Sequence, residues 1–181
     1  MEFKKSKLEG VVEITPNVFG DDRGYFLESY SKQLFLENGI DIDFVQDNQS
    51  LSSKGVLRGL HFQAPPYAQD KLVRVISGRV LDVVLDIRKN SPTYGQHEIY
   101  ELTANKKNML LVPKGFAHGF ATLEDDTIFV YKCSNLYNKE CEGGVLWNDE
   151  ALAIKWGINN PIVSEKDKIL PLFRDFESPF N

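Results

Sequence analysis

Three histidines are the first side chains to consider for acid–base chemistry or metal binding. His61 lies near the end of RGLHFQ at residues 58–63, a segment with the pattern of a strand, and His118 lies in PKGFAHGF at residues 113–120. His97 stands among polar residues, where an exposed imidazole is the ordinary expectation. A single histidine on a strand more often has a structural role than a catalytic one, so spacing alone leaves both readings of His61 open.

The histidines also carry half of a metal-binding pattern. The spacing from Pro113 to His118 resembles the second half of a metal-binding cupin motif, which supplies three histidines and one carboxylate. The first half requires a histidine two residues after His61 and a glutamate soon afterwards. This chain has Gln63 at that position and no glutamate between residues 64 and 71. Two histidines without the other ligands make a poor site, and we therefore predict no bound metal.

A lysine and a tyrosine are further candidates for chemistry. Lys71 alternates with Val73 and Val75, which favours an inward-facing ammonium, although a solvated strand edge explains the pattern equally well. A buried lysine requires an anionic partner from the protein or from a ligand phosphate. Tyr131 shares a strand face with Phe129, so it is either an ordinary core tyrosine or a proton donor in a site.

Short strands separated by Gly, Pro, Asn and Asp are expected to hold these residues. Ser31 can cap a helix that runs to Asn38, with Gly39 ending it. The dipeptide Ser77-Gly78 suits a tight hairpin. The segment after Asn135 is expected to form loops and short helical turns. We predict strands at 8–15, 25–30, 44–48, 55–62, 71–77, 79–87, 96–103, 109–112, 119–123 and 127–133, which is typical of a sandwich, jelly roll or barrel.

Length and composition indicate one soluble domain spanning residues 1–181, with 42% apolar residues available for a core. A formal net charge of −5 argues against a general nucleic-acid binder. We find neither a signal-peptide pattern nor an apolar run that could cross a membrane. Cys133 and Cys141 form no CxxC pair, so we expect reduced thiols and a cytoplasmic protein.

Seven segments resemble the dTDP-4-dehydrorhamnose 3,5-epimerase family, in the family's order and nearly from end to end of the chain. The segments are GDDRGYF at 20–26, FVQDNQS at 44–50, GVLRGLHFQ at 55–63, KLVRV at 71–75, PKGFAHGF at 113–120, YKC at 131–133 and SEKD at 164–167. The resemblance implies a mainly β cupin jelly roll with a few short helices, a homodimer with strand exchange, and no cofactor or metal. It also implies an enzyme that converts dTDP-4-dehydro-6-deoxy-α-D-glucose into dTDP-4-dehydro-β-L-rhamnose.

The resemblance further implies residue roles. His61 matches the catalytic base, Tyr131 matches the catalytic acid, and Asp167 matches the carboxylate that pairs with the histidine. CEGG at residues 141–144 is less polar than the family leads us to expect at this place. Contacts to the nucleotide sugar are implied for Arg23, Glu28, Gln46, Asp47, Asn48, Arg58, Lys71, His118, Glu142 and Lys166.

These residue types suit the implied reaction. A ketone at C4 acidifies the protons on C3 and C5, because loss of either gives an enolate with its charge on the C4 oxygen. A histidine supplies a base with a pKa near the working pH, and a phenol on the other face of the ring can return the proton with inversion. Lys71 and Arg58 are candidates to stabilise the enolate oxygen. Because Arg58 and His61 are three residues apart, a regular strand puts them on opposite faces unless Gly59 forms a bulge.

Three other functions remain open from the sequence. A relative that inverts only C3 or only C5 of a related 4-keto-deoxysugar would use the same catalytic pair. A non-catalytic nucleotide-sugar binding module would need neither His61 nor Asp167. A metal-dependent cupin oxygenase is disfavoured by the incomplete ligand set.

Overall fold

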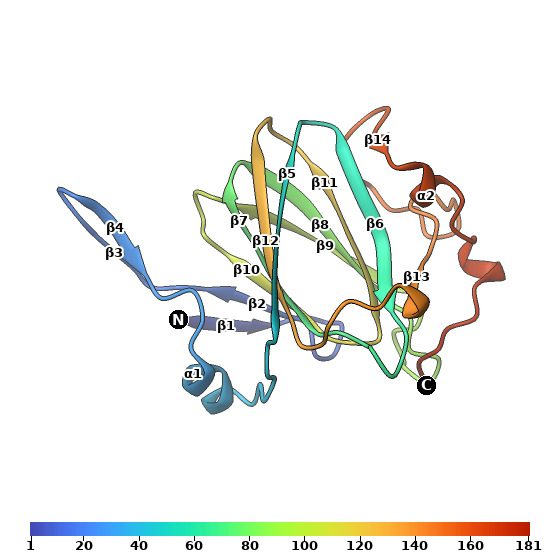
Figure 1. Ribbon diagram of the computed structural model, residues 1–181, viewed down its shortest axis with the longest axis horizontal. Coiled ribbons are helices and arrows are strands. Elements are labelled where there is room, and N and C mark those ends of the chain that lie inside the picture. Colours follow the sequence, from blue (N-terminus) through green and yellow to red (C-terminus); the bar gives the residue numbers. More distant parts are fainter.

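The computed structural model describes residues 1–181 and contains two mainly antiparallel sheets that face each other (Figure 1). The first sheet has the strand order β1 (Glu2–Lys5), β2 (Val12–Thr15), β10 (Met109–Val112), β7 (Lys71–Ser77), β12 (Thr127–Cys133) and β5 (Gln46–Ser52). The second has the order β13 (Glu142–Gly144), β6 (Val56–Gln63), β11 (Phe116–Thr122), β8 (Arg79–Asp86) and β9 (His97–Thr103), and β14 (Ile162–Val163) pairs with β6 in parallel. This arrangement confirms the predicted jelly roll.

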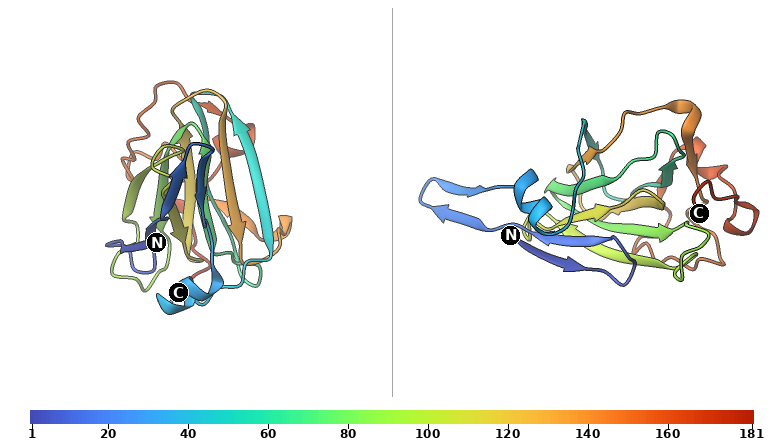
Figure 2. Two further views of the ribbon diagram at one scale, coloured as in Figure 1. Left: turned by 90° about the vertical axis from the view of Figure 1, so that its left-hand side faces the viewer. Right: turned by 90° about the horizontal axis from the view of Figure 1, so that it is seen from below.

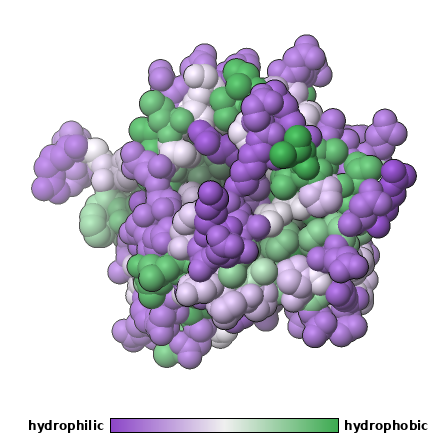
Figure 3. Space-filling model, turned by 45° about the vertical axis from the view of Figure 1, so that its right-hand side comes forward, coloured by the Kyte–Doolittle hydropathy of each residue, from purple (hydrophilic) through white to green (hydrophobic).

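A two-stranded hairpin stands apart from both sheets. It consists of β3 (Val18–Asp21) and β4 (Gly24–Leu27), and it reaches beyond the body of the molecule in the view from below (Figure 2). In the space-filling view, this arm projects on the left and ends in a hydrophilic tip (Figure 3). We call β3 and β4 together the hairpin arm.

The helices are short and lie at the margins of the sheets. In α1 (Lys32–Glu37), the Ser31 hydroxyl accepts a hydrogen bond from the Leu34 N–H at 3.4 Å, as the predicted cap requires. Helix α2 (Glu165–Lys168) lies beside β6, and two 3₁₀ turns, η1 (Lys139–Cys141) and η2 (Phe173–Asp175), complete the set (Figure 1). None of these helices reaches the length and apolarity that a membrane crossing requires.

Both faces of β8 are buried, which explains its two-sided apolar pattern. Val80 and Val84 belong to the core between the sheets, whereas Val83 and Leu85 pack under the C-terminal segment. A third core lies on the outer face of the first sheet under α1 and includes Phe35. The two sheets therefore pack together through buried residues of β8 and β9, and the space between them opens near β5 and β6.

Several sequence predictions differ from the structure. Leu8 begins a turn rather than a strand, and β2 starts only at Val12. No hairpin forms at Gly78, because β7 and β8 lie in different sheets and the positive φ of 80° at Gly78 turns the chain from one sheet to the other. The prediction also lacked β1, β3, β13 and β14, which are at most four residues long.

Candidate active site

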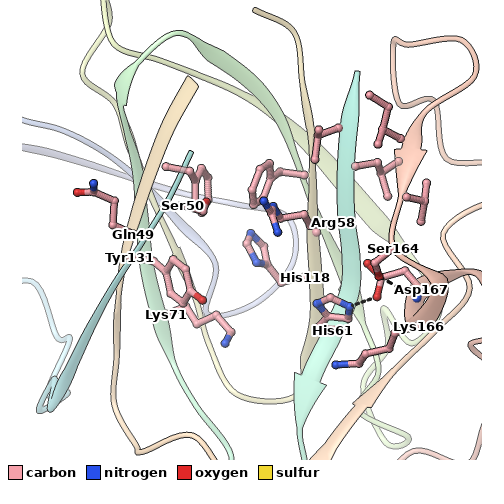
Figure 4. Close-up of a pocket in the computed structure, with 17 residues that line it drawn as sticks. Gln49, Ser50, Arg58, His61, Lys71, His118, Tyr131, Ser164, Lys166 and Asp167 are labelled. Atoms are coloured by element: carbon pink, nitrogen blue, oxygen red, sulfur yellow. Dashed lines mark hydrogen bonds and ion pairs between the residues drawn. The ribbon is translucent and has the colours of Figure 1, made fainter. Parts of the chain in front are cut away.

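A cavity of about 450 Å³ lies between the two sheets, beside β5 of the first sheet and β6 of the second. One wall comes from β12 and β7 of the first sheet, and the other from β6 and α2 (Figure 4). Most of the residues with predicted roles line it, namely Arg58, His61, Lys71, His118, Tyr131, Lys166 and Asp167.

His61 and Asp167 form a hydrogen-bonded pair in this cavity. The distance from His61 Nε2 to Asp167 Oδ1 is 2.6 Å, and the Gly59 N–H donates to Asp167 Oδ2 at 3.3 Å. Burial alone would raise the pKa of Asp167, but the hydrogen bonds from His61, Gly59 and the Ser164 hydroxyl hold that pKa below its usual value. The carboxylate therefore stays ionised, and the other ring nitrogen of His61 remains available to the cavity.

A bulge at Gly59 brings Arg58 and His61 to the same cavity. His61 is opposite His118 on β11, whereas Arg58 is opposite Phe120, so β6 has one residue more than its partner between these two pairs. Gly59 has a φ of 123°, which a residue with a side chain rarely adopts. This settles the geometric question left open by the sequence.

Tyr131 and Lys71 face His61 from the opposite sheet. Both side chains point into the cavity, with the Tyr131 hydroxyl directed toward its centre (Figure 4). The Lys71 Nζ lies 5.6 Å from the centre of the Tyr131 ring. Burial raises the pKa of Tyr131 and lowers the pKa of Lys71, so the phenol remains protonated at neutral pH.

His118 belongs to a second buried pair. Its Nε2 lies 2.9 Å from both carboxylate oxygens of Asp82, which is completely buried. Burial raises the pKa of Asp82, and His118 opposes that effect. Asp82 alternates with the apolar Val80 and Val84 along β8, and it was not among the predicted site residues. An acidic side chain in a buried apolar alternation is the signal that predicts such a partner.

Gln63, which replaces a metal-ligand histidine, is fully engaged with the backbone. Its Nε2 donates to the carbonyl oxygens of Tyr67 at 2.7 Å and Leu136 at 3.1 Å, and its Oε1 accepts from the Asn138 N–H at 2.7 Å. The chain has no cluster of three or more His, Cys, Asp or Glu side chains suited to a metal ion. Gln63 thus anchors the segment after β12 to the loop after β6.

The residues predicted on β5 divide between its two faces. On the inner side, Asn48 Nδ2 donates to the Cys133 sulfur at 3.6 Å, and Asn48 Oδ1 accepts from Gln46 Nε2 at 3.1 Å. The Asp47 carboxylate instead pairs with Lys132 at 3.0 Å. Alternation along the strand turns it to the outer face, so the structure does not bring the Asp47 side chain to the cavity.

Glu142 and Lys166 form an ion pair beside the cavity. Lys166 lines the cavity from α2, and Glu142 accepts a further hydrogen bond from the Tyr137 hydroxyl at 3.0 Å. Burial would raise the pKa of Glu142, but Lys166 and Tyr137 lower it. Tyr137 was not predicted, although an exposed aromatic residue beside a predicted binding residue is a usable signal.

Two predicted residues lie far from the cavity of their own chain. Arg23 lies at the tip of the hairpin arm, where its side chain is 89% exposed and pairs with Asp21. Glu28 follows β4 and is also exposed. Neither can act on a ligand in this cavity unless it comes from another subunit.

Comparison with known proteins places this site in a family. The sequence pattern described as dTDP-4-dehydrorhamnose 3,5-epimerase matches residues 5–175. The chain belongs to this family. An epimerase of that name from Salmonella typhimurium is 51% identical to the chain over 93% of both sequences.

Two solved structures support the assignment of the chain to this epimerase family. The Bacillus anthracis enzyme of the same name, with TDP and PPi bound, is 48% identical, has a TM-score of 0.93, and matches 95% of this chain and 99% of its own. A Legionella pneumophila dTDP-6-deoxy-D-glucose-3,5-epimerase, in complex with dTDP-4-keto-L-rhamnose, is 40% identical, with a TM-score of 0.93 and coverage of 97% and 94%.

Proposed function

We propose that this epimerase inverts C3 and C5 of dTDP-4-dehydro-6-deoxy-α-D-glucose and so forms dTDP-4-dehydro-β-L-rhamnose. The observation that carries the proposal is the position of a histidine–carboxylate pair and a phenol on opposite walls of one cavity (Figure 4). A sugar ring held between the two sheets meets a base on one face and a proton donor on the other. Inversion at carbon requires removal of a proton from one face and its return to the other, and this arrangement provides a group for each step.

In the proposed reaction, His61 removes the proton from C5 or C3 with the ring nitrogen that faces the cavity. Asp167 fixes the tautomer of His61 and stabilises the imidazolium that forms. Lys71 and Arg58 then stabilise the enolate charge on the C4 oxygen. A preorganised donor of this kind contributes about 3–4 kcal/mol to stabilisation of the transition state. Tyr131 delivers a proton to the opposite face, which inverts the centre.

The remaining cationic and polar groups suit the nucleotide. Lys166, which pairs with Glu142, can exchange this partner for a phosphate oxygen, and Arg58 offers a second charged donor. We propose that Gln46, Asn48 and His118 complete the substrate contacts from the inner wall, and that Asp47 contributes through its backbone. Glu142 acts by positioning Lys166 before the phosphate binds.

The active form in this proposal is a homodimer in which each hairpin arm completes the partner's cavity. The arm exposes three aromatic side chains, Phe19 at 64%, Tyr25 at 63% and Phe26 at 69%. The outer face of the first sheet is uncovered near β5 and β7, where Leu51 and Ile76 are exposed. Two apolar surfaces on each chain can bury one another in a two-fold dimer, and this exchange carries Arg23 and Glu28 to the second cavity.

We propose that the enzyme is a single domain of residues 1–181 that works in the cytoplasm without metal or cofactor. Free Cys133 and Cys141 suit a reducing compartment. The engagement of Gln63 with backbone groups supports the absence of a metal. Full activity is expected after exhaustive chelation, measured together with elemental analysis. About one zinc, iron or manganese per chain, with activity lost on its removal, would contradict this.

Proton NMR in D2O with dTDP-4-keto-6-deoxyglucose tests the proposed function. We expect deuterium at both C3 and C5, with the configuration of both centres inverted. Deuterium at one carbon alone would identify a single-centre epimerase. Incorporation at neither carbon, by protein that still binds dTDP, would leave only a binding module.

A further inference from the structure

The Lys71 ammonium has a single side-chain hydrogen-bond acceptor, and that acceptor is neutral. Its Nζ lies 2.8 Å from Gln69 Oε1. Glu142 acts on it only at longer range and is itself paired with Lys166 and Tyr137. The Lys71 side chain is therefore held in place without forming an ion pair.

Gln69 is itself fixed in one orientation. The side chain is 8% exposed, and its Nε2 donates to the Asn135 carbonyl oxygen at 2.7 Å. Rotating the amide by half a turn would set its NH₂ group against the Lys71 ammonium and its oxygen against the Asn135 oxygen. Both contacts would be repulsive, so the two neighbours together define where the acceptor lies.

We propose that Gln69 is a positioning residue for the epimerase reaction, which aims the Lys71 ammonium at the C4 oxygen of the enolate. Because the amide carries no charge, it orients the ammonium and leaves its charge for the developing oxyanion. A carboxylate at position 69 would form an ion pair with Lys71 and compete with the enolate. The inference rests on the proposed function, since it requires an enolate in this cavity.

The first test is Gln69→Met, which keeps the length of the side chain and removes both hydrogen bonds. We expect kcat to fall about tenfold to a hundredfold, the scale of a misplaced catalytic group, with little change in KM or in the Kd for dTDP. Gln69→Glu is the second variant, for use also if Gln69→Met fails to fold. It should lower kcat at least as much, because it pairs with the ammonium.

A double-mutant cycle separates positioning from general support of the fold. If Gln69 acts through Lys71, Gln69→Met should have almost no further effect on the deuterium-exchange rate in a Lys71→Met background. Gln63→Met is the matched control, because Gln63 anchors the same segment through Leu136 and Asn138 but does not contact Lys71. The factors by which Gln63→Met and Lys71→Met each lower the deuterium-exchange rate should therefore multiply in the double variant.

Three results would overturn the inference. A parental kcat in folded Gln69→Met or Gln69→Glu protein would rule out the proposed role of Gln69 and leave the proposed function intact. The same conclusion would follow if Gln69→Met lowered the deuterium-exchange rate as strongly in the Lys71→Met background as in the parent. Absence of exchange at C3 and C5 in the parent protein, measured in the same series, would instead refute the proposed function and the role of Gln69 with it.

Discussion

Three of the polar side chains that line this cavity have a partner that fixes their orientation. Asp167 holds one nitrogen of His61, Ser52 accepts from the Arg58 guanidinium at 3.2 and 3.3 Å, and Asp82 holds His118. The Tyr131 hydroxyl has no such partner, since no hydrogen bond from it is found. A phenol with no fixed acceptor, on the wall opposite the base, is free to face the substrate.

Tyr131→Phe separates removal of the proton from its delivery. His61 can still form the enolate in this variant, but the opposite face has no donor, and most enolate regains its proton on the original face. Where the His61 imidazolium exchanges its proton with D2O before returning it, deuterium enters with retained configuration. We expect inverted product to fall at least about a hundredfold, measured by proton NMR in D2O.

The alternative for Tyr131 is a purely structural hydroxyl, whose loss costs about 1 kcal/mol of stability and leaves turnover near normal. Rapid double inversion by a folded Tyr131→Phe protein would therefore assign proton delivery to water or to another group. Thermal unfolding of the variant provides the control for folding.

Asp167→Asn should weaken exchange without abolishing it, because it removes the orienting carboxylate but not the base. It should also change how stability depends on pH. The pKa of Asp167 is lowered in the folded state, so its contribution to stability is present above its unfolded pKa, about 3.9, and is lost as the pH falls through the folded value.

The measurement for Asp167 is the melting temperature of parent and variant between pH 7 and pH 3. The parent should be the more stable at neutral pH, and the difference should shrink below about pH 4. A difference that stays constant down to pH 3 would show that ionisation of Asp167 does not contribute to the stability of the folded state.

At the scale of elements, the bulge in β6 is the feature on which the site depends. A Cβ atom at Gly59 would lie 2.5 Å from the Gly119 Cα and 2.8 Å from the His118 carbonyl oxygen, both backbone atoms of β11. Gly59→Ala should therefore destabilise the protein by about 3 kcal/mol or more and separate Arg58 from His61.

Gly55→Ala is the matched control for that prediction. Gly55 also has a positive φ, 86°, but no atom lies within 4 Å of the position that its Cβ would take. Gly55→Ala should lower the free energy of unfolding by only about 1–2 kcal/mol, the penalty for the backbone conformation alone. Chemical denaturation of both variants measures the difference, and equal losses would show that the close approach to β11 is unimportant.

Strands with a clear apolar alternation could be predicted from the sequence, and β7, β10 and β12 have the predicted bounds. The missed strands lack that signal: every residue of β3 is exposed, and β14 has only two residues. The proposed catalytic pair illustrates the same limit. His61 and Asp167 are 106 positions apart, and no local pattern relates them, so only the family resemblance predicted their contact.

The inner and outer faces of β5 mark another limit of sequence reasoning. The residues Gln46, Asp47 and Asn48 are adjacent, and the resemblance assigned all three to the substrate. In an extended strand the middle one must point away from its neighbours, and Asp47 pairs with Lys132 on the outer face. A run of adjacent binding residues in a motif therefore predicts that their strand lines the site. It does not predict that all three side chains point into the site.

At the scale of the whole molecule, the hairpin arm makes a prediction about assembly. Arg23 is exposed on its own chain, and the proposed dimer places it in the partner's cavity. Mixing inactive His61→Asn with inactive Arg23→Ala protein and allowing subunits to exchange should restore activity. Each heterodimer then has one cavity with both defects and one with neither, so up to half of the parental rate per heterodimer is expected.

Each variant alone, taken through the same exchange procedure, is the control for that experiment. Native mass spectrometry establishes that heterodimers have formed. Proven heterodimers without recovered activity would assign Arg23 to the cavity of its own chain or to folding alone.

The position of Asp167 after every strand of both sheets also has a consequence during synthesis. Chains are made from the N-terminus and begin to fold as they emerge, so both sheets can pair before α2 exists. Until residues 164–168 leave the ribosome, the cavity contains His61 without the carboxylate that orients it. A prematurely terminated product that ends before α2 would therefore resemble the finished protein in its sheets and have little epimerase activity.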